Sequence, residues 1–431
     1  MVRDILDKKK NGVMFSYEDI RSIVDGYVSG EVSDGDMREF VMYVYENELS
    51  FSEINYLTDV MIKSGEVIDL SAIGKVCVDK HSSGGIGDKI TLIISPIVAS
   101  LGVCVPKMSG RGLGITGGTA DKLESIPGFK INMSRKSFMK ALDEAGVCVI
   151  SQSEKIAVAD KKIYALRNEI GAVDSTALIA SSIMSKKIAS GADKIVIDLK
   201  VGNGAFMKDL KSASKLAKTM IEIGKYYDRK VVCVLSDMNV PLGYNIGNAL
   251  EVKEAIDFFD GMYEKRLYFL VVYLSSIMVS LGKGICFRSA KKLVVDAIDS
   301  GLARHKFYEW IKYQGGKISK FKIDADSVKV LSDVSGYINS IDAQGIGKLV
   351  FDLGGGRVKK EDSIDYGVGV SLKKTVGEKV VKGEVLCEIF YNKKVRGMEK
   401  RALDAFVIGK RKRKEKSVVI KTIKWFFWKN V

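Results

Sequence analysis

Residues 78 to 124 decide the fold, and they read VDKHSSGGIGDKITLIISPIVASLGVCVPKMSGRGLGITGGTADKLE. This stretch contains two glycine-rich segments, here called the first glycine loop (79–88) and the second glycine loop (109–119), joined by an apolar run over 90–101. Glycine lets backbone N–H groups approach an anion closely, and a helix that begins after the first loop would point its positive end at that anion. The pattern therefore predicts an anion cradle, with two ordinary turns of an α/β sheet as the alternative.

Two common nucleotide-binding motifs do not account for these glycines. Residues 112–117 fit G-x-G-x-x-G, but a dinucleotide site also needs an acidic residue about 20 positions later, and the chain there reads Phe-Lys-Ile-Asn-Met over 129–133. The sequence contains no G-x-x-x-x-G-K-[ST] string, so a P-loop is excluded. Lysines and hydroxyl side chains in and around the loops favour a small anion instead.

Composition indicates a folded protein with more than one domain. A chain of 431 residues is expected to form two or three domains, and 46% hydrophobic with 28% charged residues is typical of globular proteins. The apolar runs stay short of the roughly 18 residues of a membrane span, and the N-terminus has no signal-peptide core. Six cysteines without a C-x-x-C pair predict free thiols in a reducing cytoplasm. The only histidines are His81 and His305, which excludes a histidine-rich metal site.

The net charge of +15 leaves two interpretations open. One is a nucleic-acid partner. However, the lysines are spread along the whole chain without interleaved aromatic residues, so a lysine-rich composition explains the same charge. A positive field would also attract phosphate or other anions. We expect neither a membrane nor a nucleic acid as partner.

Periodicity and turn signals divide the chain into three parts. Residues 1–65 predict a small all-α domain, whose helices begin at two capping boxes. Residues 76–155 and 192–330 alternate between strands and helices and predict an α/β phosphate-binding domain with a mixed or parallel sheet. Residues 331–431 predict a C-terminal α+β lobe with a basic tail.

Two further features concern the connections and the end of the chain. The segments 65–74 and 149–153 are candidate hinges, because the character of the pattern changes there. The basic run over 410–416 and the aromatic residues over 425–428 are interpreted as a solvated helix face and a fraying tail rather than as a membrane or RNA anchor.

The glycine loops also carry a resemblance. The strings DKHSSGGIGDK (79–89) and SGRGLGITGGTADKLESIPGF (109–129) resemble those of the thymidine and pyrimidine-nucleoside phosphorylases, above all the bacterial pyrimidine-nucleoside phosphorylases. The resemblance covers roughly residues 1–395. It implies a fold of the nucleoside phosphorylase/phosphoribosyltransferase type, in which a return segment at about 156–190 joins the small α domain. It also implies a homodimer formed through that domain.

The implied activity is the reversible phosphorolysis of uridine, thymidine or deoxyuridine to the free base and (2-deoxy)ribose 1-phosphate, in nucleoside salvage. Inorganic phosphate is the co-substrate and the nucleophile, so neither an organic cofactor nor an activated Ser or Cys is expected. The transition state has oxocarbenium character, and the leaving pyrimidine gains negative charge that must be stabilised. Unlike glycoside hydrolysis, the reaction needs no pair of catalytic carboxylates. The preferences between ribose and deoxyribose and between uracil and thymine stay open.

The resemblance also assigns roles to single residues. The implied catalytic residues are Lys80, His81, Arg167 and Lys186. The implied phosphate-binding residues are Lys80, His81, Ser82, Thr91, Lys107, Met108, Ser109 and Thr119. The implied nucleoside-binding residues are His81, Leu113, Tyr164, Arg167, Val173, Ile179, Ser182, Ile183, Lys186 and Phe206. A potassium ion is implied as well, with the ligands Gly87, Lys89, Leu242, Asn245 and Glu254.

Four positions depart from the family's pattern. Lys89 stands where Thr is frequent, and because a charged lysine head cannot ligate a cation, either its carbonyl serves or its ammonium replaces the ion. Asn168 stands in place of Asp, which predicts a looser Arg167 and weaker base binding. Ile115 replaces His and Val158 replaces Pro. None of the four removes a phosphate ligand, so we expect an active enzyme.

Two alternative functions stay open at this point. One is an anthranilate phosphoribosyltransferase-like enzyme on the same fold, which would use a diphosphorylated sugar and magnesium. The glycine-loop sequence of those enzymes differs from the one found here, and the pair Arg167 and Lys186 favours a pyrimidine as the substrate base. The other is a non-catalytic basic nucleic-acid-binding protein, which the charge motivates and the intact phosphate residues oppose.

Overall fold

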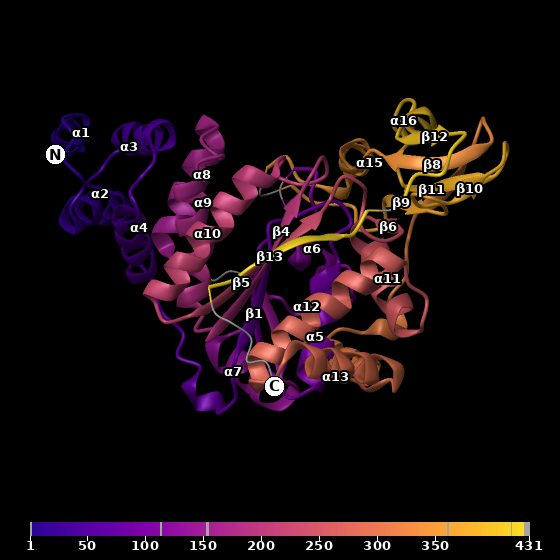
Figure 1. The fold of residues 1–431 in the computed structure, drawn as a ribbon, viewed down its shortest axis with the longest axis horizontal. Coiled ribbons are helices and arrows are strands. Elements are labelled where there is room, and N and C mark those ends of the chain that lie inside the picture. The colour runs from indigo at the N-terminus through magenta and orange to yellow at the C-terminus, as the bar shows by residue number, and fades with distance from the viewer. Residues whose placement is uncertain (1, 113, 152–154, 360–361, 415, 426–431) are drawn as a thin grey trace.

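The computed structural model describes residues 2–112, 114–151, 155–359, 362–414 and 416–425. A helical domain, a central α/β domain and a C-terminal lobe follow one another across the molecule (Figure 1). The family resemblance implied this architecture, and it is confirmed.

The helical domain is built from four N-terminal helices and two later ones. The first four are α1 (Val2–Lys10), α2 (Tyr17–Ser29), α3 (Asp34–Asn47) and α4 (Phe51–Lys63). Ser16 and Ser50 begin α2 and α4 with the two predicted capping boxes, in which each serine accepts a backbone N–H and an acidic side chain returns the bond. The later helices, α8 (Val158–Ile170) and α9 (Thr176–Ala189), pack against α2 and α4.

The α/β domain is organised around a four-stranded sheet of order β1-β4-β5-β13. Strands β1 (Val78–Ser82), β4 (Lys194–Val201) and β5 (Lys230–Asp237) are parallel. A second parallel pair, β2 (Val105–Ser109) and β3 (Val147–Ser151), continues next to β1 through the bridge between Cys77 and Cys104. Apart from their first residues, β4 and β5 are buried throughout, in the part of the chain (192–330) where strands were predicted to alternate with helices.

Helices cover this sheet and bury its apolar side chains. They are α5 (Ile90–Ser100), α6 (Thr119–Glu124), α7 (Arg135–Ala145), α10 (Leu210–Tyr226), α11 (Asn248–Phe259), α12 (Lys265–Lys283), α13 (Phe287–Asp299) and α14 (Leu302–Tyr313). By length and composition α12 could cross a membrane, but 72% of its apolar window is buried inside the protein. It packs on α5 and α13, as a core helix does.

The C-terminal lobe carries two small antiparallel sheets. One has the order β6-β9-β11-β7 and contains β7 (Asp326–Leu331), β9 (Gly369–Leu372), β11 (Val385–Tyr391) and, from the α/β domain, β6 (Asn245–Ile246). The other has the order β10-β8-β12 and contains β8 (Gly336–Ile341), β10 (Lys379–Val380) and β12 (Phe406–Gly409). Helices α15 (Ala343–Val350) and α16 (Met398–Asp404) pack on these sheets.

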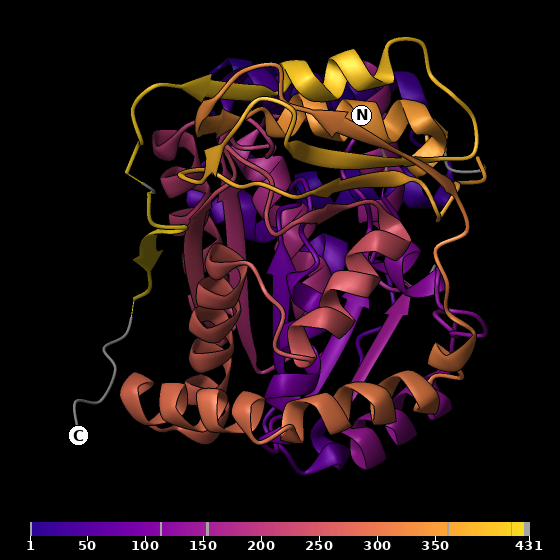
Figure 2. The same ribbon diagram turned by 90° about the vertical axis from the view of Figure 1, so that its right-hand side faces the viewer.

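The end of the chain departs from the prediction. The basic residues 410–414 and 416 form no helix, and after them β13 (Val419–Ile423) pairs antiparallel with β5 of the α/β domain. Figure 2 shows the chain leaving the lobe and running along the side of the α/β domain. Residues 419–423, expected to belong to the C-terminal lobe (331–431), are therefore part of the central sheet. There β13 satisfies backbone groups that the edge of β5 would otherwise expose. Of the aromatic tail, residues 426–428 lie outside the described residues.

The connections between the helical and α/β domains lie side by side. The backbone of Glu66 donates a hydrogen bond of 2.6 Å to the carbonyl of Lys155, and that of Ile68 donates one of 2.8 Å to Ala189. Gly65 must be a glycine, since a Cβ there would lie 2.4 Å from the Lys155 oxygen. The first predicted hinge, 65–74, thus lies against Lys155, just after the second predicted hinge, 149–153. Residues 152 and 153 of the second hinge lie outside the described residues.

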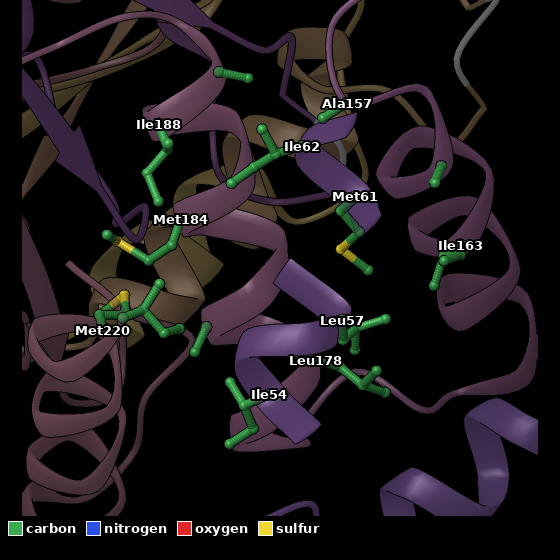
Figure 3. Packing of buried hydrophobic residues seen from close by; sticks show 14 of the residues in the cluster. Ile54, Leu57, Met61, Ile62, Ala157, Ile163, Leu178, Met184, Ile188 and Met220 are labelled. Carbon is green, nitrogen blue, oxygen red and sulfur yellow. The ribbon is translucent and has the colours of Figure 1, made fainter. Parts of the chain in front are cut away.

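One hydrophobic cluster joins the helical domain to the α/β domain. Figure 3 shows Leu57 of α4 beside Leu178 of α9, and Met184 of α9 beside Met220 of α10. Because α10 lies between two strands of the central sheet in the chain, this packing sets the position of α9 relative to the sheet. Helix α9 carries Ser182 and Lys186, so the cluster positions part of the predicted site.

Candidate active site

Lys80 is a buried cation at the middle of β1. Its side chain is 1% exposed, and its Nζ makes no hydrogen bond to any described residue. The nearest carboxylate oxygen, on Asp198 of β4, is 3.7 Å away. Burial lowers the pKa of Lys80, and the neighbouring carboxylates of Asp88 and Asp198 act in the opposite direction. A buried ammonium without an acceptor has unused capacity to bind an anion.

His81 is surrounded by lysines. Burial lowers the pKa of His81 well below 6.5, and the positive charges of Lys187, Lys107, Lys186 and Lys80 lower it further. The imidazole is therefore neutral at physiological pH and offers one N–H donor and one acceptor. His81 can therefore donate a hydrogen bond to a substrate, but it is not protonated and cannot act as a cationic acid.

A titration of the free protein tests this charge state. We expect the imidazole resonances of His81 to stay those of the neutral form as the pH falls from 8 through 6.5. The chain has only two histidines, so the exposed His305 supplies the reference signal, and a His305→Gln variant assigns the two. A midpoint near or above 6.5 for His81 would contradict the neutral imidazole.

Two more lysines stand close to His81, on β2 and α9. Lys107 is buried and donates from Nζ to the carbonyl of Met108 at 2.7 Å; burial and the charge of Lys187 lower its pKa well below 10.5. Lys187 pairs with Asp79 of β1 at 2.6 Å and reaches the same Met108 carbonyl at 3.4 Å. These contacts bind the end of α9 to β1 and β2.

The first glycine loop is held by a network of buried charges. The Ser82 hydroxyl donates to Asp88 and accepts from the Gly84 N–H at 3.2 Å. Lys200 of β4 lies 3.9 Å from Asp88 and pairs with Asp198 at 2.6 Å. Burial alone would raise the pKa of Asp88, but Lys200, Lys80 and Lys122 together hold it well below its usual range. The loop thus keeps an ionised carboxylate beside its lysines.

The second glycine loop is tied to the first loop and to the lobe. Lys122 of α6 donates to the Asp88 carbonyl at 2.7 Å and pairs with Glu251 of α11 at 2.7 Å. Asp121 accepts from the Gly112 N–H at 2.6 Å and pairs with Arg357 of the lobe at 2.5 Å. Gly118 has no room for a side chain, since a Cβ there would lie 2.2 Å from the Gly112 nitrogen.

The remaining predicted phosphate residues lie on the elements that frame these loops. Ser109 ends β2, Thr119 begins α6 and Thr91 lies in the first turn of α5. Helix α5 begins at Ile90, directly after the first loop, as the anion-cradle interpretation predicted. Ile115, in the second loop, packs against the apolar core of the lobe.

Arg167 and Lys186 form a second cationic group on α8 and α9. The buried Arg167 donates to three backbone carbonyls, those of Ala172, Val173 and Leu178, at 3.0–3.2 Å. Burial lowers the pKa of Arg167, partly offset by the charge of Asp160. Three of five guanidinium donors are used in this way, which fixes the side chain and leaves two for a ligand.

Lys186 is positioned by side chains. Its Nζ lies 2.5 Å from Asp160 of α8 and donates to the Ser182 hydroxyl at 2.8 Å. Both Lys186 and Arg167 lie over the ring of Tyr164, with the Nζ and Cζ atoms 5.8 and 5.9 Å from its centroid. The structure thus brings Tyr164, Arg167, Ser182 and Lys186 together, as the resemblance implied.

The apolar residues predicted for the nucleoside pocket are divided. Ile179 and Ile183 are half-buried on α9, one turn apart, and Val173 is half-buried in the loop before it. Phe206 is exposed, and its neighbour Ala205 bridges to Gly85 of the first glycine loop. Leu113 lies outside the described residues.

Asn168 does not bear on Arg167 in the way predicted. Its side chain is exposed at the end of α8, whereas the Arg167 guanidinium is buried and held by carbonyls. The three carbonyls hold Arg167 without any contribution from residue 168, so the prediction that Asn168 loosens Arg167 does not match this geometry. Val158 is the first residue of α8, a position that suits either Pro or Val because the helix needs no hydrogen bond from that N–H.

Sequence reasoning missed the charged partners that hold these lysines. Asp160, Lys122, Lys187, Asp198 and Lys200 were not singled out. A signal existed for the last two, because Asp198 and Lys200 interrupt the run of apolar residues over 195–201. Charges are rarely fully buried unless they are paired, so such a strand indicates a functional site.

The set of atoms expected to hold potassium does not fit that ion here. The Nζ of Lys89 donates to the carbonyls of Leu242 and Asn245 at 2.7 and 2.8 Å and to Glu254 at 2.6 Å. The carbonyl of Gly87 accepts the Lys89 backbone N–H at 2.9 Å. The other four expected ligands are thus all hydrogen-bonded to Lys89 itself, which stands as a cation where the ion was expected.

Comparisons with known proteins agree with this architecture. Residues 3–65 match the family described as glycosyl transferase family, helical bundle domain, and residues 74–304 match its a/b domain. Residues 337–408 match the pyrimidine nucleoside phosphorylase C-terminal domain.

Curated relatives match over most of their length. Pyrimidine-nucleoside phosphorylases from Staphylococcus aureus (strain bovine RF122 / ET3-1) and Bacillus subtilis (strain 168) are each 46% identical to this chain, over 402 and 397 residues. Both matches cover 90% of this chain and 92% of the relative. A solved structure, anthranilate phosphoribosyltransferase from Thermus thermophilus, superposes with a TM-score of 0.56 at 15% identity, covering 72% of this chain and 99% of that one. At that identity the likeness concerns the fold alone.

Proposed function

This chain belongs to the glycosyl transferase family, among its pyrimidine-nucleoside phosphorylases, and on this premise we propose how its residues cleave pyrimidine nucleosides with inorganic phosphate. The products are the free base and (2-deoxy)ribose 1-phosphate. The single observation that supports the assignment of the phosphate site is the buried Lys80 ammonium without a hydrogen-bond acceptor among the described residues, flanked by the two glycine loops. A phosphate dianion supplies both the charge and the acceptors that this site lacks.

Phosphate acts as the nucleophile. Held by Lys80, Lys107 and the hydroxyls of the glycine loops, one of its oxygens attacks the anomeric carbon as the bond to the base nitrogen breaks. The neutral His81 donates a hydrogen bond to a substrate oxygen without delivering a proton. Asp88 and Asp198 lie beside Lys80 and Lys200 and offset part of their positive charge before phosphate enters.

The leaving base is stabilised from the other side. The electrons of the broken bond stay on the pyrimidine, whose exocyclic carbonyl oxygens gain negative charge, and the proton that the hydrogen phosphate carried ends on the base nitrogen of the free base. Arg167 and Lys186 face this charge, and because both are held by other groups, little reorganisation is needed as the charge grows. Tyr164 and the half-buried Ile179 and Ile183 supply apolar contacts to the base.

The assignment is tested by measuring base release. Uridine, thymidine and inosine are each incubated with and without phosphate. We expect phosphate-dependent release from the two pyrimidine nucleosides and none from inosine. A further arm with anthranilate, a diphosphorylated ribose and magnesium tests the phosphoribosyltransferase alternative. Activity only in that arm, or none in any arm from folded protein, would overturn the proposal.

The phosphate and base groups belong to elements on the two sides of the domain connections. Lys80 and Thr119 lie on the α/β domain, whereas Arg167 and Lys186 lie on α8 and α9. All three connections meet at residues 65–68, 155–157 and 189–191, which favours rotation about one axis. We expect phosphate alone to leave the domains open and phosphate plus nucleoside to close them. Small-angle scattering compares these states with the free protein, and three identical curves would contradict closure.

The same premise covers the assembly and the location of the protein. We propose a homodimer through the helical domain, supported by the exposed apolar side chains of Val13, Met14, Tyr45 and Phe51 on that domain. Light scattering is expected to give twice the chain mass of 47.4 kDa for the wild type. For a Met14→Lys/Phe51→Lys double variant it is expected to give the mass of a single chain.

We also propose a reducing, cytoplasmic setting, which the six free cysteines support.

Replacing Asn168 by Asp is expected to have little effect. The side chain is exposed and Arg167 is anchored by carbonyls, so kcat/KM for uridine should change by less than about threefold. Steady-state kinetics of Asn168→Asp and of the neighbouring exposed Glu169→Gln are compared. A tenfold gain specific to Asn168→Asp would mean that the carboxylate acts on Arg167 after all.

A further inference from the structure

The ammonium of Lys89 has every hydrogen-bond donor occupied. The side chain is fully buried, and its three acceptors are the Leu242 and Asn245 carbonyls and a Glu254 oxygen, all within 2.8 Å. An ammonium group has three N–H donors and no acceptor. Lys89 therefore needs no further ligand, in contrast to Lys80, whose Nζ has no acceptor among the described residues.

The chain is wrapped tightly around this ammonium. Glu254 also accepts the backbone N–H groups of Tyr244 and Asn245, both at 2.7 Å. Gly243 has φ +76°, and a Cβ there would lie 2.8 Å from the Lys89 Nζ and 2.4 Å from a Glu254 oxygen. The turn at 242–245 thus has the form of a cation cage, in which carbonyl and carboxylate oxygens converge on one point.

One positive charge satisfies this cage. Glu254 supplies the only carboxylate that contacts the Lys89 ammonium in the described chain, so lysine and glutamate neutralise each other. A metal ion placed among the same oxygens would face the ammonium at contact distance in a buried site, where an uncompensated charge is costly. The ammonium and a potassium ion therefore exclude each other.

The cage connects three parts of the protein at the edge of the phosphate site. Lys89 precedes α5 and follows Asp88, which accepts from Ser82 and Lys122. Across the cage, Asn245 begins β6, which pairs with β9 of the lobe. The charge at Lys89 thus fixes the first glycine loop against the lobe.

We propose that Lys89 is a built-in monovalent cation: its ammonium holds the first glycine loop, the 242–245 turn and α11 together, so the enzyme works without an added potassium ion. Lys89 is in this sense a positioning residue for the phosphate site. The activity readout rests on the proposed phosphorolysis, whereas the stability readout does not.

Cation dependence tests the proposal. Wild-type protein, exchanged into tetramethylammonium chloride, receives KCl or NaCl at constant ionic strength. We expect the same kcat/KM for phosphate and the same Tm in all three salts. Lys89→Ala, which empties the cage, is expected to lose roughly 10- to 100-fold in kcat/KM in tetramethylammonium. KCl or NH4Cl should restore most of that loss with saturation, and should raise the Tm by several degrees.

Matched variants separate the cage from general effects of charge. Lys253→Ala removes the exposed lysine next to Glu254 on the same helix and should stay insensitive to the cation. Lys89→Met removes the charge but fills the space, so no salt should rescue it. If Lys89→Ala does not fold in tetramethylammonium, Lys89→Thr, whose hydroxyl can serve as a ligand, replaces it.

Three outcomes would overturn the proposal. They are saturable activation or stabilisation of the wild type by potassium, a folded Lys89→Ala that no monovalent cation rescues, and equal rescue of Lys89→Met. If wild type has no phosphorolytic activity in any salt, the proposed function fails, and the Tm comparison still decides the role of Lys89.

Discussion

Replacing Lys80 by Met is expected to lower kcat/KM for phosphate by about 10³-fold, the upper end of the cost of removing one buried electrostatic contact to the reacting groups. The donors of the buried Lys80 ammonium make no hydrogen bond to a described residue in the free protein, so its hydrogen bonds form only when phosphate binds. The loss should appear in both phosphate affinity and kcat. It is measured by initial rates at varied phosphate with saturating nucleoside.

Thermal unfolding separates this loss from misfolding. Burial opposes the charge of Lys80 in the free protein, so Lys80→Met should unfold at the same temperature as the wild type or higher. Phosphate should raise the Tm of the wild type but not that of the variant. Lys194→Met, at the start of the neighbouring strand β4, where its register partner is Val78, is the matched control and should keep both activity and the phosphate shift. A Lys80→Met protein that phosphate still stabilises would place the anion elsewhere.

Much of this site could be predicted from local sequence. The glycine loops, the start of α5 after the first loop and the capping boxes of α2 and α4 all follow from residues close together in the chain. Their physical causes are equally local: glycine at positions such as Gly118, where a Cβ would collide with the neighbouring loop, and serine oxygens that satisfy the first N–H groups of a helix.

The partners of the buried charges could not be predicted in the same way. Lys186 pairs with Asp160, 26 residues earlier, and Lys89 meets Glu254, 165 residues later. The pairing of β13 with β5 likewise joins the end of the chain to a strand near its middle. Such contacts are set by the packing of whole elements. The sequence indicates only that a buried Asp or Lys needs a partner, without saying which one.

The replacement of Lys186 by Met is expected to lower kcat by about 10²–10³-fold with little change in the KM for phosphate, since this ammonium faces the leaving base. The effect should depend on the base. 5-Fluorouridine releases a more acidic pyrimidine, whose negative charge needs less support, so the ratio of wild-type to variant rates should be smaller than with uridine. Equal ratios for the two nucleosides would mean that Lys186 binds the substrate without acting on the developing charge.

Asp160 is then expected to act only through Lys186. It lies 2.5 Å from the Lys186 Nζ, and together with Ser182 it fixes the direction of that ammonium. Asp160→Asn should therefore lower kcat by a smaller factor than Lys186→Met, and adding Asp160→Asn to Lys186→Met should cost nothing more. If the two losses multiply in the double variant, Asp160 has a separate task. That task would be the support of Arg167, because the charge of Asp160 raises the pKa of this guanidinium. Losing that support would weaken base binding even in a protein without Lys186.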